Sequence, residues 1–189
     1  MQSATINYKI SLNTIHFSKG GISLNVLIRN AKKKDWDEIK YIYNAGISTG
    51  LATFETQAPS TYEQWVIKAH SECILLAHDE NQLLGWCKIS PISDRSAYAG
   101  VGEVSIYVHP KAQGKGIGNL LLKNLIHKSE EQGFWTLQAS IFPENKNSIY
   151  LHLKNGFREV GIREKIGKLN GVWRDNVLLE RRSLVGLDI

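Results

Sequence analysis

The segment Gln113-Gly114-Lys115-Gly116-Ile117-Gly118 has the composition of a loop that binds an oxyanion. It follows the strand-like run 104–108 and precedes a leucine-rich run that begins at Leu120. A glycine-rich turn that opens a helix leaves backbone N–H groups without intrahelical partners, and these groups can close around an anion where no Cβ intervenes. The helix dipole favours negative charge at the same place. The segment therefore predicts a pyrophosphate site, with a glycine-rich connection without a ligand as the alternative.

The spacing of these glycines differs from two common phosphate-binding motifs. Gly114, Gly116 and Gly118 form GxGxG, whereas the dinucleotide fingerprint requires GxGxxG in an early βαβ unit and an acidic residue roughly 20 positions later. Gly133 stands near the position where that acid is needed. A P-loop would require Gly-Lys-Ser/Thr after a fixed gap, which is absent.

The elements that must position this loop can be read from hydrophobic periodicity. Helices are expected at 35–47, in a segment capped by Thr61 with Gln64 three residues later, from the glycine loop to Gln132, and at 145–154. Strands are expected at 26–29, 73–77, 83–89, 103–108, 134–142, 157–165 and 173–181. The order βααβββαβαββ predicts a mixed α/β (α+β) fold with too few βαβ units for a doubly wound sheet. We expect an N-terminal extension at 1–25, one domain at 26–182 and a C-terminal tail at 183–189.

The bulk composition favours one soluble domain of 189 residues. No apolar run approaches the roughly 20 residues of a membrane span, and the N-terminus lacks the pattern of a signal peptide. Cys73 and Cys87 lie in apolar runs, which predicts buried thiols in a reducing cytoplasm rather than a disulfide framework or a metal site. The net charge of +5 comes from scattered lysines and arginines, which argues against a nucleic-acid footprint. We therefore expect no metal, no nucleic-acid partner and no membrane partner.

Two spaced motifs together resemble the GNAT N-acetyltransferase superfamily. The glycine segment matches its coenzyme A loop, Q/R-x-x-G-x-G/A. The later motif N-x-x-A/S-x-x-L-Y/H-x-x-x-G-F is matched by Asn145, Ser148, Leu151, His152, Gly156 and Phe157. The resemblance runs from about Val26 to Arg182 and is closest to the phosphinothricin and methionine sulfone/sulfoximine acetyltransferase branch. Branch-specific matches are Phe54, Trp65, Arg95, Tyr98, Glu103, Trp173 and Asp175.

The resemblance implies the GNAT fold, a mixed central sheet with splayed middle strands and flanking helices. It also implies acetyl-CoA as co-substrate, with its pantetheine against the strand at 105–108 and its pyrophosphate on the glycine loop. The implied cofactor-binding residues are Ile106, Tyr107, Val108, Gln113, Gly114, Lys115, Gly116, Ile117, Gly118, Asn119, Asn145 and Ser148. A thioester is already activated, so direct attack by an aligned neutral amine needs no metal.

Free α-amines are mostly protonated at neutral pH, so the reaction needs a base. In the resembled branch the position of Glu103 is the general base, directly or through water, with the histidine at His152 as its partner. Strand alternation places Glu103 on the same face as Ser105 and Tyr107. Considered alone, Glu103 could be a surface charge at a strand end and His152 a helix-surface histidine. His152 could also protonate the leaving thiolate, and the sequence leaves these two roles open.

The resemblance further assigns Arg95 and Tyr98 to the carboxylate or acidic head group of the substrate, which suits a guanidinium fork. A solvated loop arginine beside a packing tyrosine is the alternative. Phe54 is expected to form a pocket wall or to pack in the core. The segment Pro91-Ile92-Ser93-Asp94 lacks the basic residue that some relatives carry two positions before the arginine, a departure that bears on phosphinothricin itself.

The expected function is acetyl transfer from acetyl-CoA to the α-amine of a small amino acid of the phosphinothricin or methionine sulfone/sulfoximine type. Two alternatives are an acetyltransferase for protein N-termini or polyamines, and a coenzyme A-binding sensor or scaffold without turnover. A homodimer is expected by analogy, with the apolar closing strands as a candidate interface.

Overall fold

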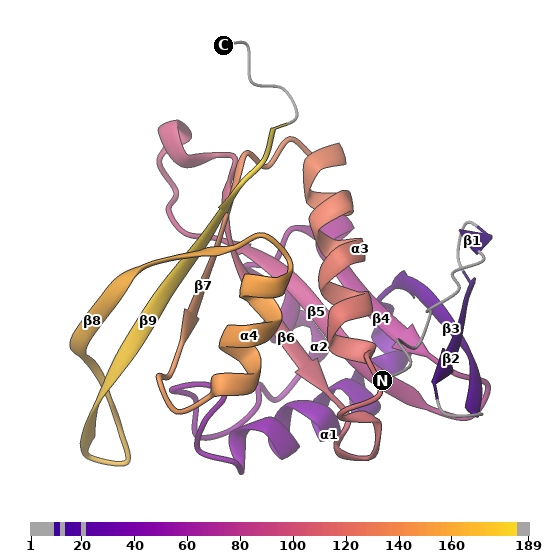
Figure 1. Cartoon of the computed structure of the whole chain (residues 1–189). Helices are drawn as coiled ribbons and strands as arrows, with labels where there is room; N and C mark the ends of the chain where they lie inside the picture. The colour runs from indigo at the N-terminus through magenta and orange to yellow at the C-terminus, as the bar shows by residue number, and fades with distance from the viewer. Residues whose placement is uncertain (1–9, 12–13, 20–21, 185–189) are drawn as a thin grey trace, which may run out of the picture.

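Alternating burial along the central strands separates two apolar cores on the two faces of one sheet. On β5, Trp86 packs with one core while Cys87 and Ile89 pack with the other. The computed structural model describes residues 10–11, 14–19 and 22–184. Within this part, the sheet has nine strands in the order β1-β2-β3-β4-β5-β6-β7-β9-β8 (Figure 1).

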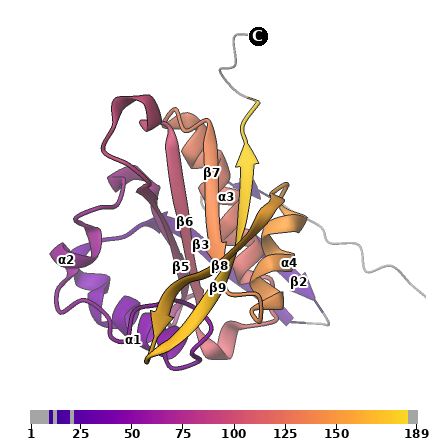
Figure 2. The same ribbon diagram turned by 90° about the vertical axis from the view of Figure 1, so that its left-hand side faces the viewer.

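The strands are β1 (Ile10–Ser11), β2 (Thr14–Lys19), β3 (Ile22–Asn30), β4 (Ile74–His78), β5 (Leu83–Pro91), β6 (Val101–Val108), β7 (Thr136–Ile141), β8 (Arg158–Leu169) and β9 (Val172–Arg182). The α-helices are α1 (Trp36–Ile47), α2 (Tyr62–Val66), α3 (Ile117–Glu131) and α4 (Lys146–Lys154). Figure 2 shows α1 and α2 on one side of the sheet and α3 and α4 on the other. The mixed sheet with flanking helices confirms the predicted fold class.

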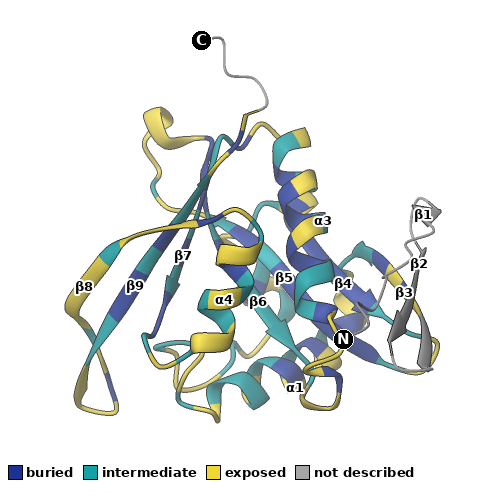
Figure 3. Cartoon of the chain, viewed as in Figure 1, coloured by how far each residue is buried: buried dark blue, intermediate teal, exposed yellow. Residues whose placement is uncertain are grey.

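The helices bury one side each. Ile39 and Ile42 of α1 pack with Trp65 of α2 in the core that contains Trp86. The inner side of α3, including Leu121 and Leu125, is fully buried in the other core. Figure 3 shows the resulting pattern, with buried residues along the central strands and on the sheet side of α3. Both cysteines are buried free thiols, as predicted.

Local capping explains where two of the helices begin. The Thr61 side chain accepts a hydrogen bond from the Gln64 amide at 3.3 Å and caps α2, as expected. The Gln64 side chain accepts from the Ser60 amide rather than from Thr61, so the reciprocal half of the expected box is displaced by one residue. Asn145 caps α4 by accepting from the Ser148 amide at 3.2 Å.

The middle of the sheet contains the predicted splay. All neighbouring strands are antiparallel except β6 and β7, which are parallel and pair only from Val101–Thr136 to Glu103–Gln138. Beyond Glu103, β6 remains paired with β5 as far as Val108, while β7 remains paired with β9 as far as Ile141. The two strands therefore separate and leave backbone groups facing a gap.

The N-terminal strands differ from the expectation. The strand expected at 26–29 begins at Ile22 and pairs with β2 along its first half, and β1 and β2 were not expected at all. Antiparallel pairing with β2 allows β3 to extend, because each added residue finds a hydrogen-bonding partner. The division into 1–25, 26–182 and 183–189 stays a prediction; residues 1–9, 12–13, 20–21 and 185–189 lie outside the described part.

Candidate active site

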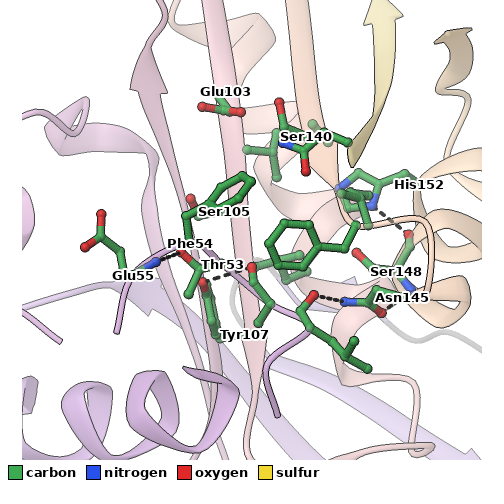
Figure 4. A pocket seen from close by; sticks show the side chains of 18 of the residues that line it. Thr53, Phe54, Glu55, Glu103, Ser105, Tyr107, Ser140, Asn145, Ser148 and His152 are labelled. Carbon is green, nitrogen blue, oxygen red and sulfur yellow. Dashed lines mark hydrogen bonds between the residues drawn. The ribbon is translucent and has the colours of Figure 1, made fainter. Parts of the chain in front are cut away.

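A cavity of about 370 Å³ occupies the gap between the separating strands, and we call it the β6–β7 cavity (Figure 4). The strands contribute Glu103 to Tyr107 on one side and Ala139 to Ile141 on the other. The rest of its wall comes from α1, the segment after α1, the connection between β7 and α4, the helix α4 and the strand β9. These elements contribute Tyr43, Leu51, Ala52, Thr53, Phe54, Glu55, Phe142, Asn145, Ser148, His152 and Asn176. Because the edge of β6 that faces β7 has no partner strand beyond Glu103, an extended ligand that carries amide groups can pair with its backbone.

The glycine loop at the start of α3 presents a set of unpartnered amides. Gly114 and Gly116 have φ values of 72° and 86°, which glycine adopts without steric cost. Within the described chain, the amides of Gly114, Gly116, Ile117, Gly118 and Asn119 have no hydrogen-bond acceptor; the first intrahelical bond runs from Leu120 N to Gly116 O. Gln113 to Gly116 are exposed. These amides and the helix dipole fit a diphosphate group.

Gly118 lies where α3, α4 and β6 approach one another. A Cβ atom at this position would stand 3.2 Å from Leu151 Cδ2 and 3.6 Å from Val108 Cγ2. The adjacent Asn119 uses its side-chain oxygen to accept from Asn155 Nδ2 at 3.0 Å, which ties α3 to the end of α4. Of these expected cofactor residues, Asn119 therefore keeps its backbone amide available while its side chain links the two helices.

His152 is buried on α4, with 1% of its surface exposed. Its Nδ1 lies 2.8 Å from the Ser148 carbonyl oxygen, which can only accept, so Nδ1 carries the proton. Burial lowers the pKa of His152, and the hydrogen bond to Ser148 opposes that shift only in part. In the neutral ring, Nε2 then holds a lone pair, and this buried atom has no partner within the described chain. The arrangement provides a proton acceptor on the wall of the β6–β7 cavity.

Glu103 is the last residue of β6 that pairs with β7. Its half-buried carboxylate makes no hydrogen bond or ion pair with another described residue and lines the β6–β7 cavity. Figure 4 shows Glu103 on β6 and His152 on α4 bordering the same cavity. The structure thus brings together the two side chains that the sequence suggested for acid–base chemistry.

Other expected residues in the cavity have partners of their own. Asn145 accepts from the Ser148 amide and donates to the Leu51 carbonyl at 3.2 Å, which fixes the segment after α1 against α4. Tyr107 stacks on Trp86 at 4.4 Å between ring centroids, and burial raises the pKa of Tyr107 above its usual range. Phe54 lines the cavity and contacts Phe142 edge-on at 4.8 Å. Ser148 and Ile106 also line this cavity.

A second cavity of about 640 Å³ lies beside α2, and we call it the α2 cavity. It is lined by Tyr43, Glu55, Gln57, Ala58, Pro59, Ser60, Gln64, Trp65, Ile67, Lys68, Lys88, Ser90, Pro91 and Glu103. Glu103 lines both cavities. The carboxylate therefore stands where a ligand in the strand gap and a ligand beside α2 could approach each other.

Of the three residues expected to bind substrate, Phe54 lines the β6–β7 cavity, whereas Arg95 and Tyr98 lie apart from both cavities. Arg95 and Tyr98 are both exposed in the connection between β5 and β6, with the guanidinium carbon 5.7 Å from the Tyr98 ring centroid. Neither residue lines the β6–β7 cavity or the α2 cavity. Lys88, which sequence reasoning did not single out, does line the α2 cavity. A lysine inside the otherwise apolar run 83–89 was the available signal.

Across the part of the chain that the structure describes, no helix is long and apolar enough to cross a membrane. In the same part, no group of three or more His, Cys, Asp or Glu side chains could hold a metal ion.

Comparison with known proteins gives consistent matches. Residues 36–157 match the model of the acetyltransferase (GNAT) family. Phosphinothricin N-acetyltransferase from Alcaligenes faecalis is 32% identical over 162 residues, covering 82% of this chain and 81% of the relative. The L-methionine sulfoximine/L-methionine sulfone acetyltransferase of Pseudomonas paraeruginosa is 30% identical over 162 residues, covering 83% and 94%. The structure of a phosphinothricin acetyltransferase from Sinorhizobium meliloti in complex with acetyl-CoA superposes with a TM-score of 0.75 at 31% identity, covering 83% of this chain and 88% of that one.

Proposed function

Because the chain belongs to the acetyltransferase (GNAT) family, and within it to the branch of the phosphinothricin and methionine sulfoximine/sulfone acetyltransferases, we propose that it acetylates the α-amine of a small amino acid or analogue. Acetyl-CoA supplies an activated acyl group. The observation that carries the proposal is the order of three elements. The strand β6 borders the gap and carries Glu103, the glycine loop with its unpartnered amides follows β6 along the chain, and α4 places His152 on the wall of the same gap.

In this proposal the protein holds the co-substrate with its backbone. The free edge of β6 from Ser105 to Tyr107 pairs with the pantetheine amides, and the amides from Gly114 to Asn119 bind the diphosphate. Tyr107 stacks on Trp86, and this contact orients the Tyr107 ring in the wall of the gap. The Asn145 side chain caps α4 and donates to the Leu51 carbonyl, which ties the start of the helix that carries His152 to the segment after α1.

Glu103 is the general base of the proposed reaction. Its carboxylate has no competing partner among described residues and borders both cavities, so it can take the proton of an ammonium group that enters from the α2 cavity. His152 presents a lone pair at Nε2 rather than a proton, which favours its role as an acceptor in the same proton transfer, directly or through water. This tautomer favours the base-partner role of His152 over the role of acid toward the leaving thiolate.

The test is a thiol-release assay with acetyl-CoA and a panel of the twenty amino acids and their sulfone, sulfoximine and phosphinate analogues. We expect turnover on acidic or oxidised amino acids, and a fall in kcat of roughly 10²- to 10⁴-fold in Glu103→Gln with acetyl-CoA affinity unchanged. Glu159→Gln, at an exposed position of β8, is the charge-matched control. Turnover confined to peptides or polyamines would support the alternative acetyltransferase, and binding of acetyl-CoA without any turnover would support a sensor. Wild-type kcat in Glu103→Gln would refute the assigned base.

A further inference from the structure

Lys88 is a half-buried cation without a counter-anion. Its Nζ donates to the Trp65 carbonyl oxygen at 2.8 Å and lies 5.0 Å from the centroid of the Trp65 ring. Within the described residues it forms no ion pair, and burial is the cause of its lowered pKa. An ammonium group has three N–H donors, so one carbonyl leaves two of them free.

A purely structural role explains this lysine incompletely. The Trp65 carbonyl lies near the end of α2, where a cation is favourable. However, α2 has only five residues, and a neutral donor could satisfy the same carbonyl without the cost of removing a charge from water. Burial lowers the pKa of Lys88 to about 8, because removing the ammonium group from water destabilises its charged form. An anion that enters the α2 cavity would offset this cost.

The register of the sheet relates Lys88 to the proposed base. Lys88 pairs with Ser105 and Ser90 pairs with Glu103, so Lys88 and Glu103 are diagonal neighbours on one face of β5 and β6. Diagonal neighbours have Cβ atoms about 7–8 Å apart. A ligand with an ammonium group at Glu103 and an acidic group a few bonds away can therefore reach Lys88.

We propose that Lys88 binds the anionic group of the acceptor amino acid, and that the α2 cavity is the acceptor site. This inference rests on the proposed function and defines its substrate class: the acceptor carries an acid close to the amine. Gln64 and Ser60 provide polar groups along the same cavity. Arg95 and Tyr98 are exposed and do not line this cavity, whereas Lys88 of β5 does.

The anion can be the α-carboxylate or an acid on the side chain, and three acceptors distinguish the two. Methionine sulfone has only the α-carboxylate, its α-carboxamide has no acid, and phosphinothricin has both acids. Lys88→Met removes the charge and keeps the length of the side chain. We expect KM for methionine sulfone to rise at least about tenfold with kcat and the KM of acetyl-CoA unchanged, which is the usual loss for a charged hydrogen bond. The carboxamide should bind the wild type and the variant equally weakly.

Three controls make the result specific. Lys34→Met at an exposed position makes the same change in net charge and should leave KM unchanged. Lys88→Arg restores the charge and should recover most of the affinity. Calorimetric binding of glutarate, an anion without an amine, measures the site without catalysis and should be lost in Lys88→Met. Thermal unfolding of each variant reports whether it is folded.

The outcomes separate this proposal from the proposed function. A KM rise for phosphinothricin but not for methionine sulfone would place the side-chain acid, rather than the α-carboxylate, at Lys88. Equal KM values for wild type and Lys88→Met on all acidic acceptors would overturn the inference while the acetyltransferase activity stands. A KM rise in Lys68→Met instead would locate the anion at the exposed rim of the cavity and would also overturn it. If the wild type acetylates no amino acid, the proposed function fails, and glutarate binding still decides whether Lys88 binds an anion.

Discussion

The conformation of the glycine loop can be tested by Gly114→Ala. Gly114 has φ 72°, a region that costs an L-residue roughly 1–2 kcal/mol, while the space around its Cβ position is open. The substitution therefore adds no clash and acts only on the backbone. The exposed loop can avoid this cost by leaving the positive-φ conformation, which withdraws the amides that we expect to bind the diphosphate.

The penalty sets the size of the effect. To bind the co-substrate, the Gly114→Ala loop must return to the positive-φ conformation at a cost of about 1–2 kcal/mol. This cost should raise the KM of acetyl-CoA by about 5- to 30-fold, because each 1.4 kcal/mol corresponds to a factor of about ten. The kcat at saturating acetyl-CoA should be unchanged, since the reacting groups lie at the other end of the co-substrate. The assay is thiol release at varied acetyl-CoA with a fixed acceptor.

Gly133→Ala is the matched control at the opposite end of α3. Gly133 has φ 82° and open space at its Cβ position, so the same conformational penalty applies. We expect the midpoint of thermal unfolding to fall by roughly 2–8 °C, with the KM of acetyl-CoA unchanged. If Gly114→Ala raises KM no more than Gly133→Ala does, the amides of the glycine loop do not bind the co-substrate as argued.

Two further predictions concern pH. Because burial lowers the pKa of His152 below its ordinary value of 6.5, the unfolded chain binds one more proton between the two pKa values, so the contribution of His152 to stability is lost as pH falls through this window. The Tm of the wild type should therefore fall more steeply than that of His152→Gln as the pH is lowered below 6.5 in scanning calorimetry, and parallel curves would contradict a buried neutral imidazole. Because the pKa of Lys88 is lowered to about 8, glutarate as a competitive inhibitor should bind best below that pH, and its Ki should rise about tenfold per pH unit above it. A pH-independent Ki is expected in Lys88→Arg, and the same flat profile in the wild type would argue against the lysine as the anion site.

Local patterns were sufficient for most of the fold. The cap at Thr61, the glycine loop and the hairpin of the last two strands are specified by neighbouring residues, and the structure confirms their positions. The strand β3 begins four residues before the predicted start, and the sequence carries a signal for this because Ile22, Leu24, Val26 and Ile28 recur with a period of two. A domain boundary at residue 25 places the first residues of this run in the N-terminal extension and leaves only the part from Val26 in the predicted strand.

The candidate site was harder to predict from the sequence than the fold, because the properties of its residues depend on tertiary packing. Isolated in sequence, His152 resembles a helix-surface histidine, but α4 packs against the chain after it, and the Phe157 ring contacts the imidazole edge-on at 5.0 Å. This packing creates the burial that selects the neutral ring. The surroundings of Lys88 could not be predicted for the same reason. An apolar run predicts a strand, but it does not show which face of the sheet carries the lysine. It also does not show that Trp65, from a helix distant in sequence, contacts this lysine.

One feature of the sheet connects the two proposed ligands. Parallel pairing of β6 and β7 ends at Glu103, and beyond it each strand is hydrogen-bonded only on its outer side. Unpaired backbone groups inside a protein are costly unless a ligand or water satisfies them, so the gap favours an extended molecule with amide groups. Since Glu103 is the last paired residue, its carboxylate stands at the point where the strands separate and borders both cavities. A longer β6–β7 ladder would close the first cavity and leave the base facing only the second, so the length of this ladder determines whether the two substrates can meet.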